Sequence, residues 1–402
     1  MTFGVTRLIL GASALVFTSA LSVAVNGQAP ARPQAPPPAA AQAAAPQSDV
    51  MLSDQLFKNI QVLKGIPIPE FMGTMGVFSA SLGMSCEDCH AADDRAWENF
   101  AVDNPRKRQA RRMITMMQEL NKTYFGGRQV VTCFSCHRGA DRPRTAADLN
   151  VLYGEPPPDP RHVIAQAPNQ PTPDSILDKH IQAVGGAQRI AAITSFTATG
   201  QAVGYGPESA EERKVEIYAK APNQLTTIIH TGNGDITTTH DGKNAWVAAP
   251  LRQPVPVMTL SGQELDASSL DMAVALPTRL RQALTKWRTG FPTTIDDKDV
   301  NVVQGTTMGG VVATFYFDAE SGLLVRQMRY VESPVGPLVR QIDYDDYKDV
   351  NGVKMPHHIV QTWLDGRENI MLDQIRANAN VPATRFNKPA PPVAPPAGNA
   401  RP

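Results

Sequence analysis

Apolar residues recur at helical spacing in two segments of the first half of the chain. Pro69–Leu82 carries them three and four positions apart, and Gly83 follows it directly. Pro105–Phe125 has an apolar face rich in methionine, with Asn104 placed as an N-cap before it and a Gly-Gly pair after it. The pattern predicts two helices, and a pair of cysteines follows each of them after a short turn.

The second half shows a different pattern, in which apolar and polar residues alternate. A short helix is predicted after Asp174, ending at Gly185-Gly186. Three later segments alternate or are β-branched, as half-buried strands do: Lys214–Ala219, Leu225–His230 and Val311–Phe317. Asp241-Gly242 and Asn351-Gly352 suit tight hairpin turns, and a longer helix is expected near Leu276–Trp287. We therefore expect an α+β domain with a curved antiparallel sheet and one or two covering helices.

Proline-rich stretches separate these regions from each other and from the chain ends. The predicted organisation is therefore multidomain. Its parts are an N-terminal signal (1–28), a Pro/Ala linker (29–47), an all-α domain (48–155), a Pro-rich linker (156–173), the β-rich α+β domain (174–388) and a disordered tail (389–402).

The N-terminus has the features of an export signal. Arg7 supplies a positive charge, the apolar run Leu8–Val25 follows, and small residues around Ala24–Ala29 offer a cleavage site. Residues 1–28 are thus a signal peptide or, because the run approaches the length of a spanning helix, an uncleaved signal anchor. Both alternatives predict an exported, periplasmic protein, and the second adds attachment to the membrane.

Composition narrows the class of protein further. With 402 residues and 42% hydrophobic content, the chain can build two domains with real cores. Lys+Arg 38 and Asp+Glu 38 give a formal net charge of zero, which argues against a general binder of nucleic acid. Four cysteines are too few for a secreted disulfide scaffold.

All four cysteines fall in two copies of the pattern Cys-x-x-Cys-His, the attachment signature of c-type haem. Two thiols on one helical turn can add across the vinyl groups of the porphyrin, and the adjacent imidazole then lies under the iron. We therefore predict two covalently bound haem c groups. The residues that hold them are the thiols of Cys86, Cys89, Cys133 and Cys136 and the imidazoles of His90 and His137.

Two other uses of the cysteines compete with haem. Both pairs could hold one zinc ion, or each pair could form a disulfide. Neither alternative gives the two histidines a role, and a zinc site of this type is unusual in an exported protein. We therefore prefer the haem interpretation.

The sixth ligand of each iron decides whether the haem carries electrons or catalyses a reaction. A methionine thioether raises the potential of an electron carrier, whereas an open position permits peroxidase-type reactions. Met75 is the expected ligand of the first haem, with Met72 as the alternative. For the second haem, the preceding helix offers Met113, Met116 and Met117, although a methionine row at helical spacing also suits a core.

Several runs of residues resemble the cytochrome c subunit of bacterial photosynthetic reaction centres. They are Ala110–Met113, Leu120-Asn121, Val131–Gly139 and the earlier stretch Met75–His90. The resemblance implies methionine ligation by Met75 and Met113, and electron donation to an oxidised photosynthetic pigment pair. It covers only a two-haem portion. Well-known members of the family carry four haems and are commonly anchored through a lipid on an N-terminal cysteine, which this chain lacks.

The β-rich domain resembles the half-barrel fold of outer-membrane lipoprotein-sorting carriers. Besides the opening helix, the likeness rests on Phe317–Leu323, Asp343–Pro356 and Arg385-Phe386. In that family the concave face holds an acyl chain, and here the expected role is docking or scaffold. His357-His358 does not indicate a metal site, because neighbouring strand residues point to opposite faces; we expect one partly buried and one exposed histidine.

Basic residues cluster on the second predicted helix: Arg106, Lys107, Arg108, Arg111 and Arg112. They form a solvated helix face, or else Arg111 or Arg112 pairs with a haem propionate while the others dock an acidic partner.

The sequence thus predicts a periplasmic dihaem c-type cytochrome that carries electrons and is not an enzyme. Its expected partners are periplasmic redox proteins, with a membrane-bound reaction centre or respiratory complex as candidates, and not nucleic acid. Two alternatives stay open: a dihaem peroxidase-type enzyme with an open distal site, and a respiratory electron-transfer protein unrelated to photosynthesis.

Overall fold

A computed structural model of the chain describes residues 50–90, 97–143, 145–146, 167–204, 210–250, 255–276 and 280–392. The predicted signal, the Pro/Ala linker, most of the Pro-rich linker and most of the tail lie outside these residues. Within the described part, no helix is both long enough and apolar enough to cross a membrane.

Short and long helices make up the first region, which we call the helical region (residues 50–143). Its helices are α1 (Ser53–Leu56), α2 (Ile68–Leu82), α3 (Cys86–Cys89), the 3-10 helix η1 (Trp97–Ala101), α4 (Pro105–Phe125) and α5 (Cys133–His137). Both long helices predicted from the apolar pattern are confirmed, as is the N-cap, because the Asn104 side chain accepts the N–H of Lys107. Gly83 and Gly126 end α2 and α4 in the left-handed conformation.

An apolar cluster joins the two long helices. Buried Phe71 and Val77 of α2 pack with Ile114 and Met117 of α4. The same cluster takes in Val335 from the second region, so the core of the helical region is completed by residues far along the chain.

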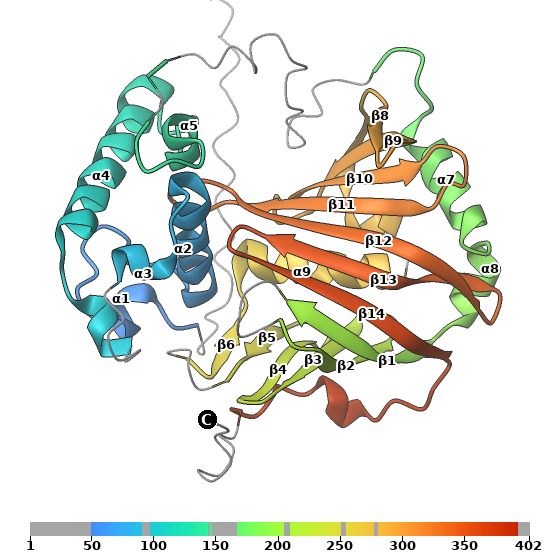
Figure 1. The fold of residues 1–402 in the computed structure, drawn as a ribbon. Coiled ribbons are helices and arrows are strands. Elements are labelled where there is room, and N and C mark those ends of the chain that lie inside the picture. Colours follow the sequence, from blue (N-terminus) through green and yellow to red (C-terminus); the bar gives the residue numbers. More distant parts are fainter. Residues whose placement is uncertain are drawn as a thin grey trace, which may run out of the picture. The chain divides into compact units, whose positions relative to one another are not determined.

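The second region, which we call the β domain (residues 167–392), is built on one antiparallel sheet (Figure 1). Its strands are β1 (Ser195–Gly204), β2 (Arg213–Lys220), β3 (Gln224–Thr231), β4 (Gly234–His240), β5 (Ala245–Ala248), β6 (Val257–Thr259), β7 (Thr285–Thr289), β8 (Thr293–Ile295), β9 (Lys298–Thr306), β10 (Val312–Asp318), β11 (Leu324–Val331), β12 (Leu338–Val350), β13 (Val353–Trp363) and β14 (Gly366–Ala377).

The strand order is β6-β5-β4-β3-β2-β1-β14-β13-β12-β11-β10-β9-β7, with β8 paired to β9. Most neighbours in sequence are neighbours in the sheet; the exceptions are that β1 pairs with β14, that β7 pairs with β9, and that β6 and β7 lie at opposite ends of the order. At the bulge in that pair Gly200 comes so close to β14 that a Cβ atom would lie 2.0 Å from the Met371 carbonyl oxygen. The curved antiparallel sheet predicted from the alternating segments is therefore confirmed.

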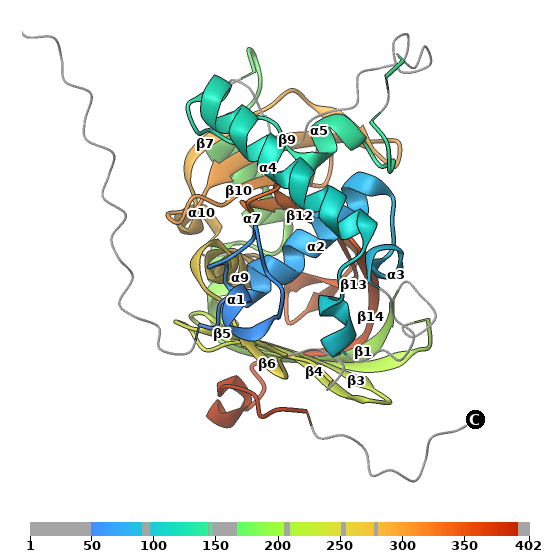
Figure 2. The ribbon, with the colours of Figure 1, turned by 90° about the vertical axis from the view of Figure 1, so that its left-hand side faces the viewer.

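Helices cover one face of this sheet. They are α7 (Pro173–Ala183), α8 (Ala187–Ala192), α9 (Gly262–Ala275) and α10 (Leu280–Ala283). The 3-10 helix η3 (Ala383–Phe386), near the end of the chain, lies on the other face, where Arg385 contacts Thr226 and Tyr218. Figure 2 shows the sheet curving around α9. Leu270 of α9 and Leu177 of α7 pack on Phe315 and Phe317 of β10, which gives the domain one of its two large apolar clusters.

The predicted helix over Leu276–Trp287 is wrong. The longer helix is α9, which ends at Ala275 with Leu276 as its C-cap, and only α10 lies inside the predicted range. Trp287 belongs to strand β7, which pairs with β9 and packs its indole beside Phe315. Pairing with a sheet edge therefore overrode the local helical spacing.

Both predicted hairpin turns join neighbouring antiparallel strands. Asn351 and Gly352 take positive φ of 54° and 79° between β12 and β13, as a two-residue hairpin turn requires. Between β4 and β5, the Asp241 carboxylate accepts the N–H groups of Lys243 and Asn244 at 2.8 and 2.7 Å. The predicted helix after Asp174 is also confirmed as α7.

Replacing Phe315 with Ala tests the β-domain core. The side chain is fully buried, so its loss should lower the free energy of unfolding by about 3–5 kcal/mol. Phe291→Ala is the matched control, because that ring is 70% exposed, and it should change stability by less than ~0.5 kcal/mol. Denaturant titration measures both; equal effects would place Phe315 outside the core.

Candidate cofactor site

Each Cys-x-x-Cys-His motif folds around a single helical turn. The first forms α3, followed by His90, and the second forms α5, which includes His137. Ser85 precedes α3 and Thr132 precedes α5, and each exchanges hydrogen bonds with the residue three positions later. Residues three apart lie on the same side of a helix, so both thiols of each motif face one side.

Helix α4 holds both motifs, one near each of its ends. At its N-cap, Asn104 Nδ2 donates to the Cys89 carbonyl oxygen at 2.7 Å, while Oδ1 accepts the Lys107 N–H at 2.9 Å. In its last turns, the buried Asn121 donates to the Val131 carbonyl oxygen at 2.7 Å and accepts the Val131 N–H at 2.9 Å. Two asparagine side chains thus tie the segments that carry the thiols to one helix.

The two histidines are oriented in the same way. Nδ1 of His90 donates to the carbonyl oxygen of Phe100 at 3.1 Å, and Nδ1 of His137 donates to that of Ala140 at 3.0 Å. Because a carbonyl only accepts, each ring carries its proton on Nδ1 and keeps the lone pair of Nε2 for another partner. Among the described residues, neither Nε2 has a hydrogen-bond partner.

Electrostatics keep the first histidine neutral. Burial lowers the pKa of His90, and the positive charge of Lys107 lowers it further, while the bond to Phe100 acts in the opposite direction. The His90 ring also stacks on Phe100 with centroids 4.7 Å apart, which fixes its plane. A neutral, oriented imidazole with a free Nε2 is the form that binds iron.

The four cysteines are free thiols in the structure, so neither pair forms a disulfide. Burial raises the pKa of Cys86 and Cys89, and it raises that of Cys133 to about 11. In the described part of the chain, no three His, Cys, Asp or Glu side chains are grouped so as to hold a metal ion. Paired free thiols beside an oriented imidazole fit the attachment of a c-type haem, because each thiol becomes a thioether.

The methionines predicted as sixth ligands lie on the expected helices. Met75 of α2 and Met113 of α4 are both half-buried, whereas Met117 is buried in the core and Met116 is 46% exposed. Met75 packs in the same apolar cluster as Cys133 of the second motif. The assignment of Met75 to the first haem and Met113 to the second therefore stays a prediction.

The sequence did not indicate that α2 packs on α5, the second motif rather than the first. The Gly139 N–H donates to the Ser81 carbonyl oxygen at 2.9 Å, and a Cβ atom on Gly83 would lie 2.4 Å from the Gly139 carbonyl oxygen. Close approach at two glycines is a signal that spacing alone cannot provide.

The basic cluster on α4 is largely paired with acidic neighbours. Arg106 lies 3.2 Å from Asp88, and Arg111 and Arg108 lie 2.7 and 3.5 Å from Asp103. Lys107 Nζ donates to two backbone carbonyls. These contacts support the helical region itself, so the surface for an acidic partner is smaller than the sequence suggested; a propionate contact of Arg111 or Arg112 stays a prediction.

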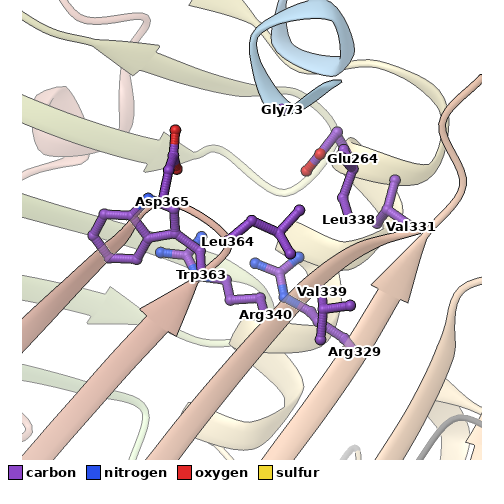
Figure 3. A pocket seen from close by; sticks show the side chains of 10 residues that line it. All are labelled: Gly73, Glu264, Arg329, Val331, Leu338, Val339, Arg340, Trp363, Leu364 and Asp365. Carbon is purple, nitrogen blue, oxygen red and sulfur yellow. The ribbon is translucent and has the colours of Figure 1, made fainter. Parts of the chain in front are cut away.

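The β domain encloses a separate cavity of about 640 Å³ on the concave side of its sheet. Apolar side chains line much of it, among them Phe196, Ile217, Ile359 and Ile370. The rest of the lining is polar. Arg329, Arg340 and Trp363 line the cavity and also a smaller pocket, and Figure 3 shows their side chains in that pocket.

Arginines on three strands line this cavity, and each has a buried Nε–H without a partner in the structure. Arg213 pairs with Glu368 at 2.6 Å and Arg329 pairs with Asp271 at 3.0 Å. Arg340 donates to Gln361 but has no ion-pair partner in the described chain. Sequence analysis missed these residues, although charged side chains at inward positions of alternating strands are a usable signal.

The adjacent histidines behave as the strand pattern predicts. His357 is buried and its Nδ1 donates to the Met355 carbonyl oxygen at 3.1 Å. His358 lies on the other face of β13, and its Nε2 contacts the Asn369 side chain at 2.9 Å. The two rings lie on opposite faces as predicted, but both are more buried than expected, since His357 is buried and His358 is half-buried.

Comparison with known proteins finds different similarities for the two regions. Residues 18–176 match the profile of the family described as "Photosynthetic reaction centre cytochrome C subunit". A curated relative, the photosynthetic reaction center cytochrome c subunit of Rubrivivax gelatinosus, is 32% identical over 97 residues, which are 23% of this chain and 25% of the relative. The first part of the chain is similar to reaction-centre cytochrome c subunits. The match spans a quarter of that relative's length.

The β domain is similar in fold to solved half-barrel structures. A LolA-superfamily protein from Nitrosomonas europaea is 16% identical with a TM-score of 0.38, covering 55% of this chain and 99% of the other. A DUF1329-family protein from Desulfovibrio piger is 11% identical with a TM-score of 0.39, covering 54% and 98%. The resemblance to reaction-centre cytochrome c subunits stated from the sequence is thus confirmed as a resemblance, and a protein of the LolA superfamily is among the solved structures that the β domain matches.

Substitution of the two asparagines on α4 tests how the motifs are held. Asn104→Ala removes a cap and the bond to Cys89, and Asn121→Ala removes the bonds to Val131. Each change should lower the free energy of unfolding by about 1–2 kcal/mol. Hydrogen exchange should quicken at residues 86–90 in the first variant and at 133–137 in the second.

The two variants serve as controls for each other, because both truncate an asparagine on the same helix. Equal exchange at both motifs in both variants would show that the asparagines stabilise the helix in general and do not hold separate motifs.

Proposed function

We propose that the protein is a periplasmic dihaem c-type cytochrome that carries electrons. The observation that supports this best is the repeated arrangement of two free thiols on one turn, followed by an imidazole whose Nδ1 is bound to a carbonyl. Cys86, Cys89, Cys133 and Cys136 would attach the two haems, and His90 and His137 would ligate the irons. When bound, haem supplies a one-electron change at iron.

The family likeness supports electron transfer as the class of function, with a reaction centre as one candidate acceptor. Periplasmic redox proteins and respiratory complexes are the other candidate partners. The export signal in residues 1–28 supports a periplasmic location, with membrane attachment if it is not cleaved. Cofactor assembly outside the cytoplasmic membrane agrees with such a signal.

Met75 and Met113 are our proposed sixth ligands. Their helices lie against the segments that bear the thiols, and both side chains are half-buried. A thioether on iron would suit electron transfer and oppose peroxidase-type chemistry, which needs an open or labile position.

Replacing Met113 with Ala in protein made with haem-maturation machinery tests the ligand assignment. Wild-type protein should carry two low-spin haems and show the weak absorption band of methionine bound to ferric iron. Met113→Ala should remove the contribution of one haem to this band. Met116→Ala, on the exposed side of the same helix, should leave the spectrum unchanged.

The opposite result, with the band sensitive to Met116 alone, would reject Met113 as ligand. Wild-type protein without covalent haem would reject the proposed function itself. A high-spin ferric haem that reacts with peroxide would favour the enzymatic alternative.

A second function is favoured by the cavity of the β domain: binding an amphiphile with an anionic head group. Arg329 and Arg340 are direct partners across the β11–β12 ladder, where like charges destabilise each other. Among the described residues, Asp271 forms an ion pair with Arg329 and not with Arg340, and the buried Nε–H groups on both arginine side chains lack acceptors. A carboxylate at this end, with its chain along the apolar lining, would satisfy both requirements.

Palmitate and its methyl ester are suitable probes, because they differ in head-group charge and share the same chain. Arg340→Gln should weaken palmitate binding at least tenfold, about 1.4 kcal/mol, and leave ester binding unchanged. Arg376→Gln, on an exposed position of β14, is the control and should alter neither. Equal affinity of wild-type protein for both probes would contradict a role for the charge.

A further inference from the structure

The connection between β11 and β12, residues 332–337, lies against the second cysteine motif. We propose that this 332–337 loop forms a wall of the second haem site and positions the motif, so that the loop acts on the second haem more strongly than on the first. The inference rests on the proposed dihaem function, and nothing in either family resemblance implies it.

Two main-chain carbonyls of the loop accept hydrogen bonds from the helical region. The Cys133 N–H donates to the Val335 carbonyl oxygen at 3.2 Å, directly at the first thiol-bearing residue of the motif. Gln129 Nε2 donates to the Ser333 carbonyl oxygen at 2.8 Å. The loop therefore fixes the segment that leads into the motif at two points.

Apolar packing reinforces these bonds. Val335 has no exposed surface, and it belongs to the cluster that contains Cys133, Met75 and Val77. Gly336 lies so close to Thr132 that a Cβ atom would meet its side chain at 3.3 Å. Water is thus kept from one side of the motif by residues of the β domain.

Strand β12 and the turn between β13 and β14 also contact α2. Leu338, the first residue of β12, packs on Gly73, where a Cβ atom would lie 2.7 Å from its side chain. Leu364, between β13 and β14, packs in the same cluster and approaches Gly76. Gly73 and Gly76, which lie on one face of α2, thus let Leu338 and Leu364 approach the helix that carries Met75.

The loop has a fixed shape of its own. The Ser333 hydroxyl donates to the Gly336 carbonyl oxygen at 2.5 Å, and Ser333 is buried. The flanking strands pair in register from Val331 and Leu338 onward. A wall supported by a rigid hairpin can hold a neighbouring group in one position, whereas a mobile loop cannot.

The same contacts have a bland explanation, in which the loop only adds general stability. The two explanations predict that a substitution in the loop affects different motifs. General stabilisation would affect both motifs alike, whereas a wall at the second motif would change that motif most, because the first is also held by Asn104 and Arg106.

Val335→Ala is the test variant, and Val303→Ala is its matched control. Both valines are fully buried, both lose the same two methyl groups, and Val303 lies in the β-domain cluster away from the helical region. In the haem-loaded full chain, Val335→Ala should lower the midpoint potential of the second haem, because admitted water favours the ferric charge, and shift that of the first haem less.

Hydrogen exchange provides a second readout that does not depend on redox activity. Exchange at residues 133–137 should become at least tenfold faster in Val335→Ala and change less at 86–90. Val303→Ala should alter neither the two potentials nor the ratio of exchange between the motifs.

The inference is overturned if Val335→Ala leaves the second potential and exchange at 133–137 unchanged, or if it shifts both motifs equally. These outcomes leave the proposed function intact, since wild-type protein would still carry two haems. If wild-type protein carries none, the proposed function fails, and the exchange ratio still decides whether the loop positions the second motif.

Discussion

The antiparallel pairing of β1 with β14 is the contact on which the rest of the β domain depends. Strand β1 follows the opening helices α7 and α8, and β14 is the last strand of the chain. Nine residue pairs join them, from Phe196–Ala377 to Gly204–Glu368. Without this pairing, β1 to β6 and β7 to β14 would be two separate sheets with no common concave face. The apolar cavity and the arginines beside it therefore depend on contacts between residues far apart in sequence, which also slows folding in general.

The helical region is organised differently. Few of its residues are buried, and side-chain hydrogen bonds hold the two cysteine motifs in place. Each motif is a single turn, too short to be stable as an isolated helix. Its position comes from neighbours: capping residues before it, an asparagine from α4, and for the second motif the carbonyl of Val335. The imidazoles are oriented by backbone carbonyls, which no substitution can easily remove.

Sequence reasoning predicted the features that are local. Periodicity and capping gave α2, α4 and α7 close to their observed ends, and alternation gave β2, β3 and β10. The cysteine motifs and the turn at Asn351-Gly352 were visible as short patterns. What failed or was missed was not local: Trp287 joined a sheet edge, and α9 has apolar residues spread around it because it lies inside a curved sheet. The pairing of Arg329 with Arg340, and the contact of residues 332–337 with the second motif, depend on register and packing that no spacing encodes.

Helix α4 has one further consequence, for how the protein can change over evolutionary time. Its two asparagines are 17 residues apart, which at 1.5 Å per residue is roughly 25 Å along the axis. The length of α4 therefore fixes the distance between the two asparagines that hold the motifs. Insertions in the connections before Asn104 or after Phe125 would leave that spacing unchanged, whereas insertion of a single residue within α4 would rotate one motif by about 100° relative to the other. The length of α4 is therefore the dimension of this region that has least freedom to vary.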